Sequence, residues 1–73
     1  EMKVGDLARV NTTRKDSYGV CVPVVSEMAF VTEVKESYSL STSKIENNVV
    51  LMFFDGYRET WYEHQLELIS ESL

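Results

Sequence analysis

The feature that most constrains this chain is an unbroken apolar run that leads directly into an Asp-Gly pair. Residues 49–54 are all apolar, Asp55 and Gly56 follow, and a second strand-like run ends at Trp61. Asp-Gly is a strong hairpin signal, because such turns need a positive φ that glycine adopts without steric cost. The pattern therefore predicts two antiparallel strands joined at Asp55-Gly56, and with them a small all-β fold.

Further short strands are expected on either side of this hairpin. Residues 7–10, 28–34 and 66–69 are rich in apolar side chains that alternate with polar ones, which is typical of strands. Residues 62–65 have the composition of one helical turn that precedes the last strand. We therefore expect five antiparallel strands and one short helical turn.

Two polar or interrupted segments are expected to be loops. Pro23 limits residues 18–25 to an edge strand or an extended loop arm, because proline cannot donate a hydrogen bond to a ladder. We expect a long, hairpin-like loop over residues 11–27. A solvated, serine-rich loop is expected over residues 36–48, with Asn47-Asn48 turning into the central hairpin.

The apolar run is hydrophobic on both faces of its strand. Successive side chains point to opposite faces, so Val49, Leu51 and Phe53 share one face. We expect that face to point into the core, together with Val4, Leu7, Val34, Leu66 and Leu68. On the other face, a two-residue turn at Asp55-Gly56 aligns Tyr57 with Phe54. The predicted partner-binding patch consists of Val50, Met52, Phe54, Tyr57 and Trp61.

Three explanations for this patch are open at the level of sequence. The loop over residues 11–27, which carries Tyr18 and several valines, can fold over the patch and complete the core. The patch can instead contact a protein partner or an identical subunit, because exposed apolar surface with aromatic residues and methionine marks interfaces. Tyr57, Trp61 and Tyr62 are also candidates for an aromatic cage around a methylated lysine.

The composition indicates one domain, residues 1–73, with an acidic surface. Twelve acidic and seven basic residues give a net charge of −5. Binding of nucleic acid normally requires a surplus of Lys and Arg on one face, so this charge disfavours nucleic acid and favours a protein partner. The alternative hypothesis of a nucleic-acid-binding barrel depends on Arg14 and Lys15, with stacking by Tyr18.

The cysteine content and hydropathy indicate a soluble, cytoplasmic protein. Cys21 is the only cysteine, so no disulfide forms within the chain and a reducing compartment is expected. No apolar run approaches the roughly 20 residues of a membrane helix, and we expect no membrane association.

The sequence contains no recognisable catalytic apparatus. His64 is the only histidine, which argues against a histidine metal cluster, and we expect it to be a surface or capping residue. Cys21 is expected to be a small buried apolar residue. Only three glycines are present, and they form no phosphate-binding loop. We therefore expect no enzymatic activity, no catalytic or metal site and no cofactor.

The order of the expected elements resembles a Src-homology-3-like small barrel. The resemblance covers nearly the whole chain and is carried by Val4-Gly5-Asp6, Val31-Thr32-Glu33-Val34, Asp55-Gly56, Trp61 and Leu66-Glu67-Leu68-Ile69. Within that fold the chain looks like short proteins of tailed bacteriophages, notably those of cyanobacteria, although residues 11–27 are longer than the phage pattern. The resemblance implies a five-stranded antiparallel barrel that acts as a non-catalytic protein-interaction module, such as a phage accessory protein in the host cytoplasm. A small barrel protein of photosystem I and the variable chain of ferredoxin–thioredoxin reductase are related folds that dock on other proteins.

Overall fold

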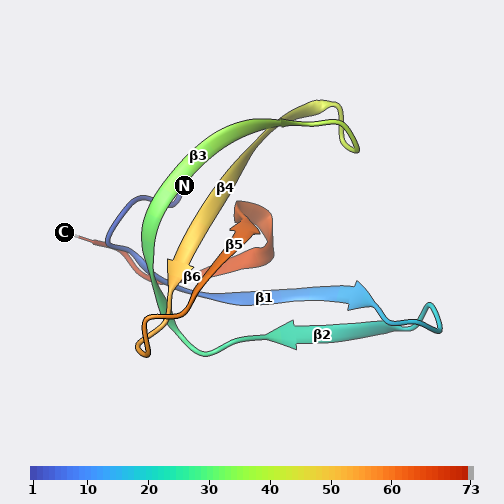
Figure 1. Ribbon diagram of the computed structural model, residues 1–73, viewed down its shortest axis with the longest axis horizontal. Coiled ribbons are helices and arrows are strands. Elements are labelled where there is room, and N and C mark those ends of the chain that lie inside the picture. The colour runs from blue at the N-terminus through green and yellow to red at the C-terminus, as the bar shows by residue number, and fades with distance from the viewer. Residues whose placement is uncertain (73) are drawn as a thin grey trace.

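The computed structural model describes residues 1–72 as an all-β molecule of antiparallel strands (Figure 1). Its elements in chain order are β1 (Leu7–Lys15), β2 (Cys21–Val25), β3 (Ala29–Ser39), β4 (Lys44–Met52), β5 (Arg58–Tyr62), the 3-10 helix η1 (Glu63–Gln65) and β6 (Leu66–Ser70). The predicted all-β class and the helical turn before the last strand are confirmed. Residues 1–72 form six strands rather than five, because residues 21–25 pair as a strand of their own.

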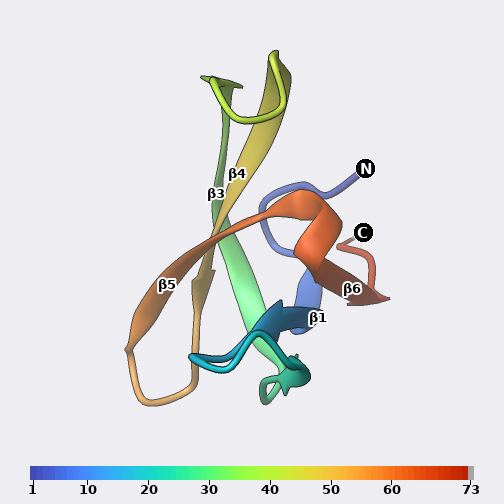
Figure 2. The ribbon, with the colours of Figure 1, turned by 90° about the vertical axis from the view of Figure 1, so that its right-hand side faces the viewer.

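The strands follow the order β2-β1-β3-β4-β5, and β6 pairs with β1. The first half of β1 lies between β3 and β6, so that Ala8 is opposite both Ala29 and Leu68. After β5 the chain passes through η1 and returns as β6 beside β1 (Figure 2). Within residues 1–72, β5 and β6 do not pair with each other, so the sheet curves without closing into the expected barrel.

The segment expected to be a long loop over residues 11–27 is largely a paired hairpin. Its turn is set by Asp16, whose carboxylate accepts the N–H groups of Tyr18 and Val20 at 2.8 and 3.0 Å. Gly19, with φ of +78°, donates its N–H to the Asp16 carbonyl at 3.0 Å. Pro23 lies opposite Thr13 in β2, which is an edge strand, as the missing N–H predicts. The hairpin projects from the sheet (Figure 1).

The prediction of a solvated loop over residues 36–48 is wrong. Strands β3 and β4 remain paired as far as Ser39 and Lys44, and only residues 40–43 form the turn. Asn47 and Asn48 do not turn but lie within β4. Polar side chains suit this part of the ladder because it forms an arm that extends beyond the core (Figure 1). Backbone pairing, rather than apolar contact, keeps the arm extended.

The core lies on one face of the sheet, which we call the inner face. Its buried residues are Met2, Ala8, Val10, Ala29, Val31, Val49 and Leu51, and Val24, Val34, Phe53, Trp61 and Leu66 pack against them. The prediction that Val49, Leu51 and Phe53 point inward is therefore confirmed. Most of these side chains are small, which fits a domain whose sheet has only a narrow interior to fill.

Three of the predicted core residues lie elsewhere. Val4 is 62% exposed, because it occupies a tight turn in which the Asp6 N–H donates to the Lys3 carbonyl at 3.1 Å. Leu7 is only half-buried and lies opposite Phe30. Ala8 and Val10 point inward, and because side chains alternate along a strand, Leu7 points to the other face. Leu68 is 37% exposed on β6, which pairs with β1 and with no other strand of the described part of the chain.

Candidate interaction surface

The opposite, outer face of the sheet carries apolar side chains that run across three strands. Leu7 is opposite Phe30, and Phe30 is opposite Met52, so these three side chains share one face. Phe54 follows the end of β4 and approaches Phe30 edge-on, with ring centroids 5.7 Å apart and an interplanar angle of 71°. We call Leu7, Phe30, Val50, Met52 and Phe54 the outer apolar face.

Much of this face is open to solvent. Phe54 is 72% exposed and Phe30 is 42% exposed, whereas the other three residues are half-buried. The β1–β2 hairpin extends away from the rest of the sheet (Figure 1). Tyr18 at its turn is 89% exposed. In this arrangement the segment over residues 11–27 leaves Phe54 uncovered.

The turn between β4 and β5 differs from the predicted two-residue turn. Gly56 donates its N–H to the Phe53 carbonyl at 2.9 Å, and the Phe53 N–H donates to the Tyr57 carbonyl at 2.8 Å. Phe54 and Asp55 are therefore the central residues, and Gly56 follows them with φ of +89°. This three-residue loop with glycine in the left-handed region is another common hairpin connection. The extra residue moves Tyr57 to the face of Phe53.

The structure consequently divides the five predicted patch residues between two faces. Val50, Met52 and Phe54 lie together on the outer face. Tyr57 lies beside Phe53 on the inner face, with ring centroids 6.3 Å apart. Trp61 is opposite Val49 and packs against the core, and its Nε1–H donates to Glu59 Oε1 at 3.0 Å.

Tyr57, Trp61 and Tyr62, the candidates for an aromatic cage, do not converge on one point. Trp61 and Tyr62 are neighbours in one strand, so their side chains point to opposite faces. The Tyr62 ring stacks on His64 instead, with centroids 5.7 Å apart and an interplanar angle of 13°. His64 is exposed, as the sequence predicts.

A cleft of about 440 Å³ opens between the β4–β5 turn and the segment that joins β2 to β3. It is lined by Ser26, Glu27, Phe53, Phe54, Asp55, Tyr57 and Glu59. The lining combines aromatic rings with carboxylates and contains no lysine or arginine. Phe54 belongs to both the cleft and the outer apolar face, so the two surfaces meet at this residue.

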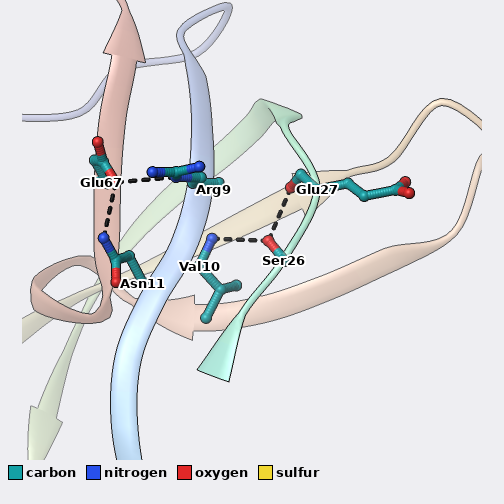
Figure 3. A network of polar contacts seen from close by, with 6 residues as sticks. All are labelled: Arg9, Val10, Asn11, Ser26, Glu27 and Glu67. Carbon is teal, nitrogen blue, oxygen red and sulfur yellow. Dashed lines mark hydrogen bonds and ion pairs between the residues drawn. The ribbon is translucent and has the colours of Figure 1, made fainter. Parts of the chain in front are cut away.

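One wall of the cleft is held in place by polar contacts with β1 (Figure 3). The Ser26 hydroxyl accepts the Val10 N–H at 2.8 Å and donates to the Glu27 carbonyl at 2.8 Å. The Ser26 N–H donates to the Val10 carbonyl at 3.0 Å. These bonds fix the backbone of residues 26–27, and the Glu27 side chain extends away from them (Figure 3).

On the other edge of β1, an ionic contact joins the strand to β6. Arg9 Nε and Asn11 Nδ2 donate to Glu67 Oε1 at 2.9 and 2.8 Å (Figure 3). The Asn11 amide, followed by the Arg9 guanidinium, lowers the pKa of Glu67 below its ordinary value. This contact joins β1 to β6 on the edge of β1 that lies away from Ser26.

The remaining residues singled out in the sequence lie outside these surfaces. Cys21 is exposed at the start of β2 rather than buried, because the hairpin projects from the core. Arg14, Lys15 and Tyr18 are exposed at the outer end of the same hairpin. Across residues 1–72, no three His, Cys, Asp or Glu side chains are grouped so that they could hold a metal ion. The described chain has no helix with the length and apolarity needed to span a bilayer.

Comparison of the chain with protein-family models, with curated proteins and with solved structures finds no match.

Proposed function

We propose that this protein is a non-catalytic protein-interaction module of the Src-homology-3-like type, and that the outer apolar face is its contact surface. The observation that carries the proposal is the exposed pair of Phe30 and Phe54, which continues into Met52, Val50 and Leu7. Covering the two rings would contribute on the order of 2–4 kcal/mol. Exposed apolar surface of this kind, with aromatic residues and methionine at its centre, is typical of interfaces.

The arrangement of strands supports the assignment to this fold type. The sheet pairs β1 with β6, which are the first and last strands in the chain, and continues from β1 through β3 and β4 to β5. A helical turn precedes β6. Folds of this kind host many unrelated functions, so the contact surface carries the functional argument. The resemblance to short phage proteins extends the proposal to an accessory role in a tailed bacteriophage.

Sedimentation equilibrium over a wide range of protein concentrations tests the proposal. We expect the wild-type protein to self-associate and Phe54→Ser to weaken that association. Tyr38→Ser is the matched control, because Tyr38 is a similarly exposed aromatic residue, at 61%, but lies on the β3–β4 arm. Equal weakening by both variants would contradict the assignment of the interface to the outer apolar face. Monomeric behaviour at every concentration would exclude self-association through the outer apolar face.

A nucleic-acid-binding function is the second candidate, and one observation favours it. Arg14, Lys15 and the 89% exposed Tyr18 lie together at the end of the β1–β2 hairpin, where a base could stack on the ring. Phosphate contacts make affinity fall steeply with salt. Fluorescence titrations of single-stranded DNA and RNA at low and high salt therefore separate the two functions. Tight binding with a steep salt dependence, abolished by Tyr18→Ser, would overturn the protein-interaction proposal.

A further inference from the structure

We infer that the cleft beside the β4–β5 turn binds the positively charged side chain of a lysine or arginine in a basic segment of a protein partner. This inference rests on the proposed function, because it specifies the chemistry of the partner. The residues of this cleft are not recognisable as one site from the sequence. Glu27 lies 28 residues from Asp55 and 32 from Glu59, and only the fold brings them together.

The carboxylates of the cleft are not compensated by cations of the chain itself. Glu27, Asp55 and Glu59 take part in none of the ion pairs found in residues 1–72. Arg58 is the basic residue nearest in sequence to Asp55 and Glu59, but it lies opposite Met52 and therefore on the outer face. Acidic side chains in a concave site focus a negative potential, which the net charge of −5 reinforces. The cleft is complementary to a cation.

Aromatic rings form the rest of the lining. Phe53 and Tyr57 lie with centroids 6.3 Å apart at an interplanar angle of 34°, and Phe54 lines the cleft beside them. The face of an aromatic ring attracts an ammonium or guanidinium group, and the apolar ring also accommodates the alkyl stem. Rings alone would accept a neutral apolar ligand, and carboxylates alone would attract a hydrated metal ion. Their combination selects an organic cation.

Two of the carboxylates are already oriented by hydrogen bonds. Asp55 Oδ1 accepts the Tyr57 N–H at 3.0 Å, and Glu59 Oε1 accepts the Trp61 Nε1–H at 3.0 Å. Each group retains a second oxygen, and a carboxylate can accept several further hydrogen bonds. The backbone of Glu27 is held through Ser26. A cleft of about 440 Å³ lies toward the small end of ligand sites, which suits one long side chain.

The test uses NMR of the ¹⁵N-labelled protein, titrated with three acetylated and amidated Gly-Gly-X-Gly-Gly peptides in which X is arginine, lysine or glutamine. We expect saturable amide shifts at Gly56, Tyr57 and Glu59 with the arginine or lysine peptide, and not with the glutamine peptide. The comparison of arginine with lysine shows which cation the cleft prefers. Absence of saturable shifts with both cationic peptides would overturn the inference.

Matched variants assign the binding to the cleft. The triple variant Glu27→Gln, Asp55→Asn, Glu59→Gln keeps the acceptors for Tyr57 and Trp61 and should weaken binding at least about fivefold. The control Glu33→Gln, Glu36→Gln, Glu46→Gln changes the net charge equally at residues that do not line the cleft. Equal loss in both triple variants would show non-specific attraction and overturn the inference.

The aromatic contribution has its own variants. Tyr57→Leu should weaken the binding of the cationic peptide about threefold, whereas Tyr57→Phe should preserve it. Unchanged binding by Tyr57→Leu would contradict a role for the ring. Self-association is measured on the same samples by sedimentation. A failure of the cleft therefore remains distinguishable from a failure of the outer apolar face as an interface.

Discussion

The carboxylate of Asp6 accepts the backbone N–H of Ser72 at 2.7 Å, and this hydrogen bond joins the two ends of the described chain. The second carboxylate oxygen accepts the Lys3 N–H at 2.9 Å, and Lys3 Nζ lies 3.3 Å from Oδ1. The Asp6 carbonyl accepts the Val31 N–H at 2.9 Å. Asp6 is fully shielded from solvent and thus links the N-terminal turn, β3 and the C-terminal segment.

We expect the stability of the protein to fall in acid through Asp6 and Glu67. The N–H groups of Ser72 and Lys3 lower the pKa of Asp6 below its ordinary value, and the pKa of Glu67 is also lowered. Because these values are lower in the folded than in the unfolded chain, the carboxylates stabilise the fold above pH about 4. That contribution disappears as the pH falls through the folded-state pKa values. Thermal unfolding should therefore give a level Tm between neutral and mildly acidic pH, and a decreasing Tm below it.

Asp6→Asn separates the contribution of Asp6 from general acid effects. The variant should have a lower Tm than the wild type at neutral pH, because the ionised acceptor of two N–H groups is lost. It should also lose less stability than the wild type on acidification. Glu67→Gln should have a smaller effect, since Glu67 lies in a partly exposed pair. An unchanged acid dependence in Asp6→Asn would contradict this role of Asp6.

The glycines should differ in their sensitivity to alanine. Gly19 and Gly56 have positive φ, and a Cβ at either position meets no atom within 4 Å, so Gly19→Ala and Gly56→Ala should each cost about 1–2 kcal/mol. Gly5 also has positive φ, but a Cβ there lies 2.8 Å from Ser72 Oγ. Gly5→Ala must therefore displace Ser72 and should cost more. Urea unfolding of the three variants measures the difference, and equal costs would show that Ser72 moves freely.

The assignment of the faces of β4 can be tested by truncation. Leu51 is fully buried, so Leu51→Ala should cost about 2–5 kcal/mol. Met52 is half-buried on the outer face, and Met52→Ala should cost only about 1 kcal/mol. Phe53→Ala should fall between them, because Phe53 packs against the core but is only partly buried. Chemical denaturation followed by circular dichroism measures all three, and the reverse order would mean that the faces are exchanged.

The hairpin and the face of β4 could be predicted because both depend on local pattern. Strict alternation along residues 49–54 assigns Val49 and Leu51 to one face, and the Asp-Gly pair marks the turn. The kind of turn could not be predicted, because Asp-Gly fits both a two-residue and a three-residue loop. One additional residue moves every following side chain to the other face. For this reason Tyr57 and Trp61 lie on the inner face.

The errors elsewhere come from contacts between segments distant in sequence. Which side chains of β1 point inward depends on the burial of Asp6, whose hydrogen-bond partner Ser72 is 66 residues away. Apolarity alone would favour Leu7 over Ala8 as the inward residue. The arm over residues 36–48 has the composition of a loop, yet cross-strand pairing makes it the paired ends of β3 and β4, with mostly exposed side chains. Phe30 could have been placed on the outer face from its position between Ala29 and Val31. The cleft could not have been predicted, because it requires Glu27 to lie beside the β4–β5 turn, which is distant in sequence.

Phe54→Ser should leave the fold intact while it removes the most exposed part of the outer apolar face. The ring is 72% exposed and has an edge-on contact with Phe30, so the variant should change the free energy of unfolding by no more than about 1 kcal/mol. Urea unfolding of Phe54→Ser and of the control Tyr38→Ser measures this change. Unfolding of the Phe54→Ser monomer would mean that residues 11–27 cover Phe54 in solution and complete the core. Retained stability with reduced self-association, in contrast, is the result expected of an interface residue.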